Sequence, residues 1–450
     1  MVEVSSFLIG GTHSGSGKTT ISLGIMAALR NRGLRVQPFK CGPDFIDPTL
    51  HKMVTGRVSR NLDLRMCGAS WCKETFTREV VNSDVGIVEG VMGLFDGGQA
   101  SSSALATTLS IPVVLVVDVR SAAESVAAVV KGFETFDPDL DVVGVIFNRV
   151  GSKRHEQLIR DSVVGNCRSR ILGFLPREAE FTIAERHLGL HMGEESPLDD
   201  NALKQLTDTI EDCIDLDYLL ANKKTIDVAK VAKRDCAVAK GRKLRLGVAR
   251  DKAFNFYYED NFDLFKQNGF ELHFFSPLTD KTLPADLDML YFGGGYPELY
   301  GAQLSENETM LADIRKYSDN GGFIHSECGG FMYLSEKIVD REGQEYPMVG
   351  VFPLAVKMRA RLSRLGYREV TFTGNCPLGK KGEKLYGHEF HYSEIINISS
   401  KIEKIYHLQD GTCEGYRVNN ALGGYLHVHF GRGRKNLQQL YENIVKSREN

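Results

Sequence analysis

Short, nearly continuous apolar runs alternate with helical periods along the first half of the chain. The runs at residues 6–10, 85–89, 111–118 and 142–148 are rich in β-branched side chains. Such runs are typical of strands that are covered on both faces of a parallel sheet. Helical periods lie between them, as in the segment from Thr19 to Asn31. The alternation predicts an α/β fold built on a parallel sheet.

The alternation of apolar runs and helical periods stops at residue 219 and begins again at residue 244. Residues 219–243 are basic and contain few large apolar side chains, which predicts a linker. A second α/β pattern starts at residue 244 and continues through further apolar strand-like runs, at 270–275, 287–292 and 322–326. We therefore expect two domains, residues 1–218 and 244–450, joined by the linker 219–243.

A glycine-rich segment follows the first apolar run and precedes a helical pattern. It reads Gly-Gly-Thr-His-Ser-Gly-Ser-Gly-Lys-Thr-Thr over residues 10–20. In such a P-loop, backbone N–H groups and the helix N-terminus surround the phosphates of a nucleotide. Lys18 is expected to reach the β- and γ-phosphates of ATP, and Thr19 to ligate Mg²⁺. The expected nucleotide contacts are Gly15, Gly17, Lys18, Thr19 and Thr20.

Acidic residues follow two other strand-like runs. One segment, 39–48, carries a Gly-Pro turn, and Glu89 ends a buried run at the sheet edge where ligands of α/β proteins bind. Oxygen ligands at such ends suit Mg²⁺ between protein and triphosphate. The expected metal ligands are Thr19, Asp44, Asp47, Glu89 and Asp96. Turn formation is the alternative role of the aspartates.

Lys40 precedes the first acidic turn. We expect its ammonium to neutralise charge on a phosphoryl group during transfer. The alternative is an exposed lysine whose stem covers apolar surface.

One cysteine lies in a sequence that is typical of a nucleophile elbow. Residues 321–332 are a strand-like run that enters small residues around Cys328 and continues into a helical pattern. A helix N-terminus at this point is expected to lower the pKa of the thiol. Gly329 is the expected first oxyanion donor, and Gly294, in the triglycine loop 293–295, the second.

Two histidines near the C-terminus are candidates for the base. His427 and His429 are two residues apart, so on a strand both face the same side. With Cys328 they favour a cysteine–histidine acyl-transfer site. A buried structural cysteine with core histidines is the alternative. A zinc site made from these three residues lacks a fourth close ligand.

The composition of the chain argues against several classes of function. Hydrophobic residues make up 42% and charged residues 25%, as in ordinary folded proteins. The net charge of −3 argues against nucleic-acid binding. No apolar run reaches the ~18–20 residues that span a bilayer, so we expect no membrane partner. The nine cysteines are scattered and never form CxxC, which predicts reduced thiols in a cytoplasmic protein.

The two candidate sites together predict a division of labour. Cys328 would release ammonia from glutamine through a thioester, and ATP would phosphorylate a carboxylate that ammonia then converts into an amide. At this point the chain resembles the cobyrinate and hydrogenobyrinate a,c-diamide synthase family over nearly its whole length. The resemblance rests on several long stretches, at residues 11–20, 40–48, 89–97, 185–190, 253–258, 293–300, 327–333, 361–369 and 387–392.

This resemblance implies a glutamine-hydrolysing, ATP-dependent carbon–nitrogen ligase of cobalamin biosynthesis. Its substrates would be cobyrinic acid, L-glutamine and ATP, with Mg²⁺. The first domain would be similar to dethiobiotin synthetase, and the second to flavodoxin-like class I glutamine amidotransferases. The resemblance makes Cys328 the nucleophile and His427 its base, and it places Asn148 against adenine.

The resemblance has one departure at the triad. Class I amidotransferases carry His-x-Glu, whereas this chain reads His427-Val-His429. The third triad member is therefore His429 or is absent.

Several alternatives stay open. The same chemistry on hydrogenobyrinic acid or Ni-sirohydrochlorin is one, and a homodimer is open as the assembly. A switch ATPase similar to ParA and MinD is another, although His13 stands where those proteins carry a signature lysine. Arg361, Arg368 and the aromatic segment 256–258 are candidates for binding the macrocycle, with ion pairs and core packing as their alternative roles.

Overall fold

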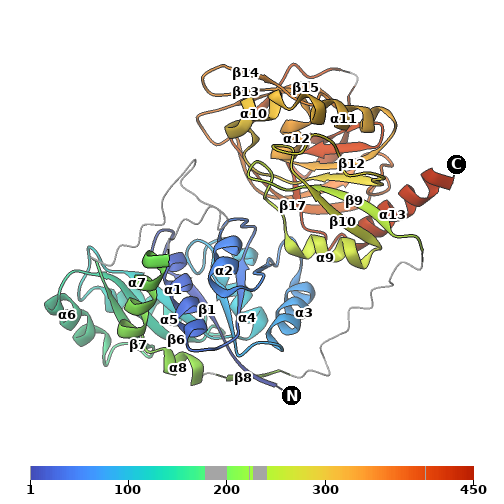
Figure 1. Cartoon of the computed structure of the whole chain (residues 1–450). Coiled ribbons are helices and arrows are strands. Elements are labelled where there is room, and N and C mark those ends of the chain that lie inside the picture. The colour runs from blue at the N-terminus through green and yellow to red at the C-terminus, as the bar shows by residue number, and fades with distance from the viewer. Residues whose placement is uncertain (1, 178–199, 222, 227–240, 401, 450) are drawn as a thin grey trace. The chain divides into compact units, whose positions relative to one another are not determined.

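The computed structural model describes residues 2–177, 200–221, 223–226, 241–400 and 402–449 (Figure 1). The chain divides into two compact units, Met1–Lys233 (unit 1) and Arg234–Asn450 (unit 2). The predicted motif at residues 185–190 and the larger part of the predicted linker, 227–240, lie outside the described residues. No described helix has the length and apolar character needed to cross a membrane.

Unit 1 is built on an eight-stranded sheet with the order β3-β2-β4-β1-β5-β6-β7 and with β8 paired to β1. All pairings along this path are parallel, which confirms the predicted parallel sheet. The strands are β1 (Val2–Gly11), β2 (Val36–Cys41), β3 (Arg60–Leu62), β4 (Val85–Glu89), β5 (Val113–Asp118), β6 (Val142–Val150), β7 (Arg170–Pro176) and β8 (Lys223–Ile226).

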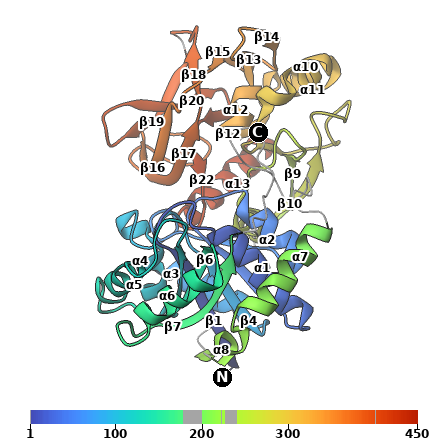
Figure 2. The same cartoon turned by 90° about the vertical axis from the view of Figure 1, so that its left-hand side faces the viewer.

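Helices cover both faces of this sheet (Figure 2). They are α1 (Lys18–Asn31), α2 (Asp47–Thr55), α3 (Ala69–Val80), α4 (Ser102–Leu109), α5 (Val126–Thr135), α6 (Lys153–Val163), α7 (Asp200–Cys213) and α8 (Leu216–Ala221). Phe7 and Ile9 of β1 pack in one core with residues of α1, α2 and α7. This double cover explains why β5 is apolar at every position from Val113 to Val117.

The strand β8 is a difference from the prediction, because it lies within the expected linker. It pairs antiparallel with Val2–Ser5, the first residues of β1. The parallel neighbour β5 pairs with β1 only from Leu8 onward, so the start of β1 leaves backbone groups for another strand. The basic composition of the segment gave no sign of this pairing.

Unit 2 contains a ten-stranded mixed sheet with the order β10-β9-β11-β12-β21-β20-β19-β16-β17-β22. The pairings from β10 to β21 are parallel, and the remaining ones are antiparallel. Its strands are β9 (Leu244–Ala249), β10 (Phe270–Phe275), β11 (Met289–Phe292), β12 (Phe323–Glu327), β16 (Arg364–Phe372), β17 (Lys384–His391), β19 (Glu403–Leu408), β20 (Cys413–Val418), β21 (Ala421–Gly424) and β22 (His427–Val428).

A second sheet and five α-helices complete the described part of unit 2. The four-stranded sheet has the order β14-β13-β15-β18. Its strands are β13 (Ser335–Val339), β14 (Glu345–Pro347), β15 (Phe352–Met358) and β18 (Ser393–Ile396), and the helices are α9 (Glu259–Gln267), α10 (Gly301–Glu306), α11 (Glu308–Asp319), α12 (Gly329–Tyr333) and α13 (Arg434–Glu449). The unit is therefore α/β as predicted, with antiparallel strands that the sequence analysis did not identify.

The order of the strands brings the candidate residues of each unit together. In unit 1, β1 lies beside β4, and β4 lies beside β2, so the P-loop, Glu89 and Lys40 meet at the carboxyl ends of three adjacent strands. In unit 2, β11 and β12 are adjacent, so the triglycine loop and Cys328 also leave the sheet side by side. Carboxyl ends of parallel strands are where α/β proteins bind ligands.

Candidate active sites

The loop between β1 and α1 has the backbone conformation of a phosphate-binding loop. Gly15 and Gly17 have φ angles of 80° and 99°, which favour glycine. A Cβ atom on Gly17 would lie 2.1 Å from Nδ2 of Asn148. The loop therefore needs glycine at this position for two reasons, the backbone angle and the close approach of Asn148.

Two side chains of β6, which is separated from β1 by β5, hold this loop in place. Asn148 Nδ2 donates a hydrogen bond to the carbonyl of Ser16 (2.9 Å), and Arg149 Nη1 donates to that of Gly15 (2.9 Å). Lys18 Nζ donates to the carbonyl of His13 (3.2 Å) across the loop. Burial, with a contribution from Lys40, lowers the pKa of Lys18. The amide nitrogen of Asn148 thus supports the loop, and its contact with adenine stays a prediction.

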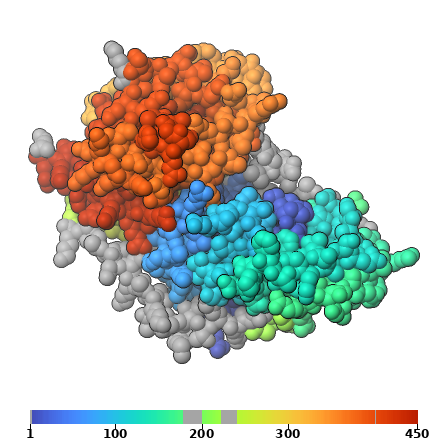
Figure 3. All heavy atoms as spheres, turned by 180° about the vertical axis from the view of Figure 1, so that it is seen from behind, coloured from blue at the N-terminus to red at the C-terminus, as the bar shows by residue number. Residues whose placement is uncertain are grey.

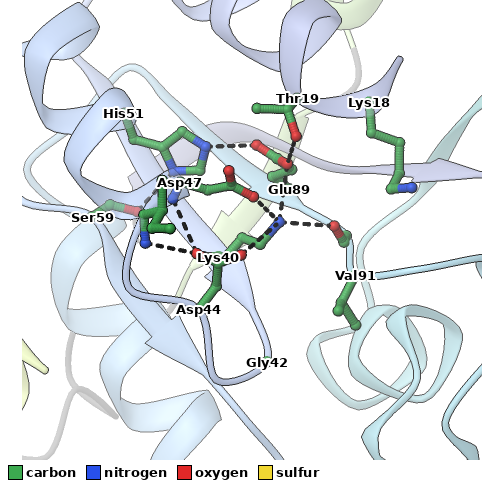
Figure 4. A network of polar contacts seen from close by, with 12 residues as sticks. Lys18, Thr19, Lys40, Gly42, Asp44, Asp47, His51, Ser59, Glu89 and Val91 are labelled. Carbon is green, nitrogen blue, oxygen red and sulfur yellow. Dashed lines mark hydrogen bonds and ion pairs between the residues drawn. The ribbon is translucent and has the colours of Figure 1, made fainter. Parts of the chain in front are cut away.

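Lys40 is the centre of a buried ionic cluster in unit 1 (Figure 4). Only 3% of the residue is exposed, which rules out the surface lysine considered from the sequence. Its Nζ lies 2.5 Å from Asp47 Oδ2, 3.0 Å from Glu89 Oε1 and 4.0 Å from Asp44 Oδ2. Burial opposes the charge of Lys40, but these carboxylates together raise its pKa well above the usual value.

Glu89 connects this cluster to the P-loop. Its Oε1 accepts a hydrogen bond from the hydroxyl of Thr19 (2.7 Å), and its Oε2 lies 2.7 Å from Nε2 of His51. The other ring nitrogen of His51 lies 3.0 Å from the hydroxyl of Ser59. Burial raises the pKa of Glu89, but Lys40, His51 and Thr19 outweigh it and lower the value. His51 is fully buried in α2, and the sequence analysis did not identify it.

The five predicted Mg²⁺ ligands do not all converge. Among the described residues, no three acidic, histidine or cysteine side chains are grouped so that they could hold a metal ion. Asp44 Oδ1 accepts hydrogen bonds from the backbone of Ile46 and Asp47, and exposed Asp96 accepts one from Gly93. Both aspartates thus make hydrogen bonds that are typical of turns, and their roles as Mg²⁺ ligands stay predictions. Thr19, Glu89 and Asp47 also provide oxygen donors beside the P-loop, and such donors fit Mg²⁺.

Cys328 occupies the sharp turn between β12 and α12. Its φ and ψ angles are 46° and −107°, which a non-glycine residue rarely adopts. Such a conformation costs on the order of 1–3 kcal/mol and persists mainly at functional sites. The Sγ atom lies 3.9 Å from the carbonyl oxygen of Phe390, and 6% of the residue is exposed. The predicted nucleophile elbow is therefore present in the backbone.

The triglycine loop lies between this elbow and His427. A Cβ atom on Gly329 would lie 2.8 Å from the carbonyl oxygen of Gly295, and one on Gly294 would lie 2.4 Å from Cε1 of His427. The backbone N–H of Gly330 donates to Gly293 (2.9 Å). The elbow, the loop and the imidazole thus meet at one place, as the sequence analysis expected.

A carboxylate next to the nucleophile contacts the candidate base. Glu327 Oε2 lies 3.8 Å from Nδ1 of His427. The other oxygen, Oε1, lies 2.9 Å from Nε2 of His325 and accepts a hydrogen bond from the backbone of Val428 (3.3 Å). His429 lies 3.9 Å from Asp260. Glu327 is therefore a candidate for the acidic partner that the missing His-x-Glu motif left unidentified.

Both groups of the candidate pair are held in their neutral forms. Burial, followed by the charges of His388 and His391, lowers the pKa of His427 to about 3. Burial also raises the pKa of the Cys328 thiol, with Glu298 as the next cause. The expectation that a helix N-terminus lowers the pKa of Cys328 is therefore wrong. The helix α12 has only five residues, and desolvation of a buried thiolate outweighs its dipole.

Comparisons with known proteins find two family models that match this chain, one in each half. Residues 7–190 match the family model of the CobQ/CobB/MinD/ParA nucleotide binding domain, and residues 245–435 match that of the CobB/CobQ-like glutamine amidotransferase domain. A cobyrinate a,c-diamide synthase of Caldanaerobacter subterraneus subsp. tengcongensis is 42% identical over 94% of each chain. The enzyme of the same name from Syntrophotalea carbinolica is 41% identical over 94% of this chain and 95% of its own.

The chain belongs to the cobyrinate a,c-diamide synthase family. A member from Salmonella typhimurium is 39% identical over 96% of each chain. Because such relatives match both units, the family also accounts for the amidotransferase unit, which the switch ATPase considered from the sequence leaves unexplained.

The structure shows other contacts for several residues that we considered for binding the macrocycle. Phe256 and Tyr258 are buried in the core, and the hydroxyl of Tyr257 accepts a hydrogen bond from the backbone of Gly293 (2.8 Å). Phe256 and Tyr258 therefore offer little surface to a macrocycle, whereas Tyr257 is partly exposed and supports the triglycine loop. Arg368 pairs with buried Glu389 at 2.9 Å, which is the ion pair that was its alternative role.

Proposed function

We propose that this chain amidates the a- and c-side-chain carboxylates of cobyrinic acid and consumes one ATP and one glutamine for each amide. One observation carries the proposal. A P-loop beside the buried Lys40–Glu89 pair and a strained Cys328 beside an imidazole occur in one chain, whose relatives are named for this reaction. The two sites supply the two halves of a glutamine-dependent amidation.

The first half is the release of ammonia in unit 2. The Cys328 sulfur attacks the side-chain amide carbon of glutamine, and His427 accepts the thiol proton and passes it to the leaving nitrogen. The backbone N–H groups of Gly329 and Gly294 stabilise the oxyanion. Ammonia leaves, and water then hydrolyses the thioester to glutamate. Because both groups start neutral, proton transfer accompanies the attack on glutamine.

Glu327 orients His427 in this mechanism. Its carboxylate lies 3.8 Å from Nδ1 and favours the tautomer with the proton on that atom, so that the other ring nitrogen carries the lone pair that accepts the thiol proton. We expect Glu327→Gln, which keeps the shape but removes the charge, to lower kcat for glutamine hydrolysis by about 10²- to 10⁴-fold. The measurement is glutamate release, from which kcat and KM for glutamine are obtained at each pH.

A matched variant tests whether the effect is specific. Glu336→Gln makes the same change at an exposed position of β13, and its glutamate release should equal that of the unaltered enzyme. Ammonium-dependent amidation should be unchanged in both variants. A Glu327→Gln enzyme with normal kcat and normal pH dependence would remove this residue from the mechanism.

The second half is activation of the carboxylate in unit 1. The substrate carboxylate attacks the γ-phosphate of ATP and forms an acyl phosphate, and ADP leaves. Lys18 and Lys40 neutralise the charge that moves during transfer. The acyl phosphate then reacts with ammonia, and inorganic phosphate leaves. Thr19, Glu89 and Asp47 would hold Mg²⁺, which screens the charge of the triphosphate when bound.

The choice of macrocycle is tested by direct competition. Purified enzyme with ATP and glutamine should convert cobyrinic acid into a diamide and form two ADP and two glutamate per product, because each amide needs one of each. Hydrogenobyrinic acid and Ni-sirohydrochlorin, which need the same chemistry, should react more slowly. Mass spectrometry of the products separates the three. Preferred amidation of either alternative would contradict the proposed substrate.

The cellular compartment of the reaction is part of the proposal. We place it in the cytoplasm, where ATP is available and thiols are reduced. None of the eight described cysteines forms a disulfide. The homodimer stays a prediction from the sequence.

A further inference from the structure

A buried histidine lies next to the site of carboxylate activation in unit 1, and the steps above do not use it. His51 belongs to α2 and has no exposed surface. Figure 4 shows its ring between Ser59 and Glu89. Its Nε2 lies 2.7 Å from Oε2 of Glu89, and its Nδ1 lies 3.0 Å from the hydroxyl of Ser59. Both ring nitrogens therefore have a protein partner.

The helix α2 explains why this histidine reaches the carboxylate. Asp47 and His51 are four residues apart, so they lie on the same face of α2. From this face Asp47 binds Lys40, and His51 binds Glu89. Because Lys40 and Glu89 also pair with each other at 3.0 Å, one helix holds both members of the pair. The two contacts fix α2 against the carboxyl ends of β2 and β4.

The segment after α2 folds back and holds the other side of the ring. Gly56 ends the helix with a φ angle of 71°, and the chain returns through Ser59 to β3. Ser59 is 3% exposed, and its hydroxyl contacts Nδ1 of His51. A hydroxyl can donate or accept a hydrogen bond, so it satisfies this nitrogen whether or not the nitrogen carries a proton. The imidazole is therefore fixed from both sides.

The carboxylate of Glu89 needs such a partner because its last torsion is soft. This torsion has broad minima in glutamate, so the side chain does not orient its two oxygens by itself. In the structure the two oxygens have different partners. Oε1 accepts hydrogen bonds from Thr19 (2.7 Å) and Lys40 (3.0 Å), whereas Oε2 contacts His51. With Oε2 held by the imidazole, Oε1 faces the threonine of the P-loop and the lysine at the same time.

The burial of His51 excludes a direct part in the chemistry. The P-loop itself is accessible, because residues 13–15 are exposed and dark blue atoms from the start of the chain are visible on unit 1 in Figure 3. Glu89 connects Thr19 of this loop to His51. The order serine, histidine and carboxylate is also that of a nucleophilic triad, but buried Ser59 offers no hydroxyl to a substrate. His51 can therefore act on the reaction through Glu89.

We propose that His51 is a positioning residue for carboxylate activation. Its Nε2–H holds Oε2 of Glu89, so that Oε1 aligns Thr19 and the ammonium of Lys40 with the phosphoryl group that ATP transfers. The inference rests on the proposed function, in which Lys40 neutralises charge during this transfer. It deepens that function by naming the residue that orients the buried carboxylate.

Two amide substitutions separate the two ring nitrogens. His51→Gln keeps an N–H group near the place of Nε2, whereas His51→Asn keeps one near the place of Nδ1. We expect His51→Asn to lower kcat for ammonium-dependent amidation by about 10- to 100-fold, the usual effect of losing a partner that orients a functional carboxylate. His51→Gln should recover most of this loss. KM for ATP and for cobyrinic acid should change by about twofold or less, because the lost alignment acts during transfer.

Controls separate this effect from damage to the fold. Lys52→Gln changes the next residue of α2, which is exposed, and should amidate like the unaltered enzyme. Glutamine hydrolysis in unit 2 should continue in every variant. If His51→Asn fails to fold, Ser59→Ala decides the question, because it frees the ring and should lower kcat by about 2- to 10-fold, the size of one hydrogen bond. An unchanged kcat in Ser59→Ala would then overturn the proposal.

A measurement without ATP or Mg²⁺ tests the contact itself. In protein labelled with ¹⁵N in its histidines, the ring signals that are absent from His51→Gln belong to His51. Their nitrogen shifts should show a proton on Nε2, because an ionised carboxylate accepts hydrogen bonds and donates none. A proton on Nδ1 alone would contradict the proposed contact.

A double variant tests whether His51 acts through Glu89. Glu89→Gln combined with His51→Asn should be no slower than Glu89→Gln alone, whereas independent residues would give effects that multiply. Multiplied effects, or equal losses in His51→Asn and His51→Gln, would overturn the positioning role and leave the proposed function intact. If the unaltered enzyme forms no amide from cobyrinic acid, ATP and ammonium, the proposed function fails and the inference fails with it.

Discussion

Replacement of Cys328 by alanine should remove glutamine as a nitrogen source and leave ammonia as one. The sulfur is the only atom in the proposed mechanism that forms a covalent bond with glutamine, so we expect glutamine-dependent amidation to fall by roughly 10³- to 10⁶-fold. Amidation with a high concentration of an ammonium salt should stay within about twofold, because the carboxylate is activated in unit 1. Amide formation with each nitrogen source is the measurement.

The same experiment has an internal control in another cysteine. Cys376 is buried in the same unit and has no role in the proposed mechanism. Cys376→Ala also removes a buried sulfur, so it should have a similar small effect on stability and no selective effect on glutamine. Equal loss of activity with glutamine and with ammonium in Cys328→Ala would contradict the division of labour between the two units.

The features that sequence predicted well are those that depend on neighbouring residues in the chain. The strands of unit 1 are buried on both faces, so they are apolar at consecutive positions, and this pattern is visible locally. The P-loop and the elbow at Cys328 also follow from short segments, because glycine and other small residues are required where the backbone turns sharply. Both candidate sites are therefore recognisable from local sequence alone.

The partners of these residues come from distant segments, and for that reason the sequence did not reveal them. Lys40 is buried because Asp47 and Glu89 neutralise it, and the pairing of β2 with β4 brings Glu89 to it from 49 positions away. His51 reaches Glu89 from helix α2, 38 positions away in the chain. Glu327 contacts His427 only because β12 and the C-terminal strands belong to one sheet. A signal was present, since alternation on a strand places His325 and Glu327 on one face.

Replacement of Glu89 by glutamine should have the opposite signature to the change at Cys328. Glu89 is bound to Lys40, Thr19 and His51, so the change disturbs the P-loop, the lysine and the proposed Mg²⁺ site together. We expect amidation to fall by about 10²- to 10³-fold with glutamine and with ammonium alike. Glutamine hydrolysis in unit 2 should continue, so glutamate would form without a matching amount of amide. The ratio of glutamate to amide is the measurement.

Stability provides a second readout of the same variant, and its pH dependence has a definite sign. Lys40 and its neighbours lower the pKa of Glu89 in the folded state, so this residue stabilises the fold at every pH above the pKa of an unfolded glutamate. The contribution disappears as the pH falls toward the lowered folded-state value. Breaking a buried pair on one side costs about 3–5 kcal/mol, so Glu89→Gln should unfold at lower urea concentration at pH 7, and less so in acid.

The matched substitution Glu3→Gln tests whether the effects of Glu89→Gln are specific to the buried cluster around Lys40. Glu3 is an exposed residue at the start of β1, at the opposite end of this strand from the P-loop. Glu3→Gln should therefore unfold like the unaltered enzyme and keep both activities, because an exposed charge contributes about 1 kcal/mol or less. If Glu89→Gln amidates normally with ammonium, then the buried cluster is structural, and carboxylate activation must depend on other residues near the P-loop.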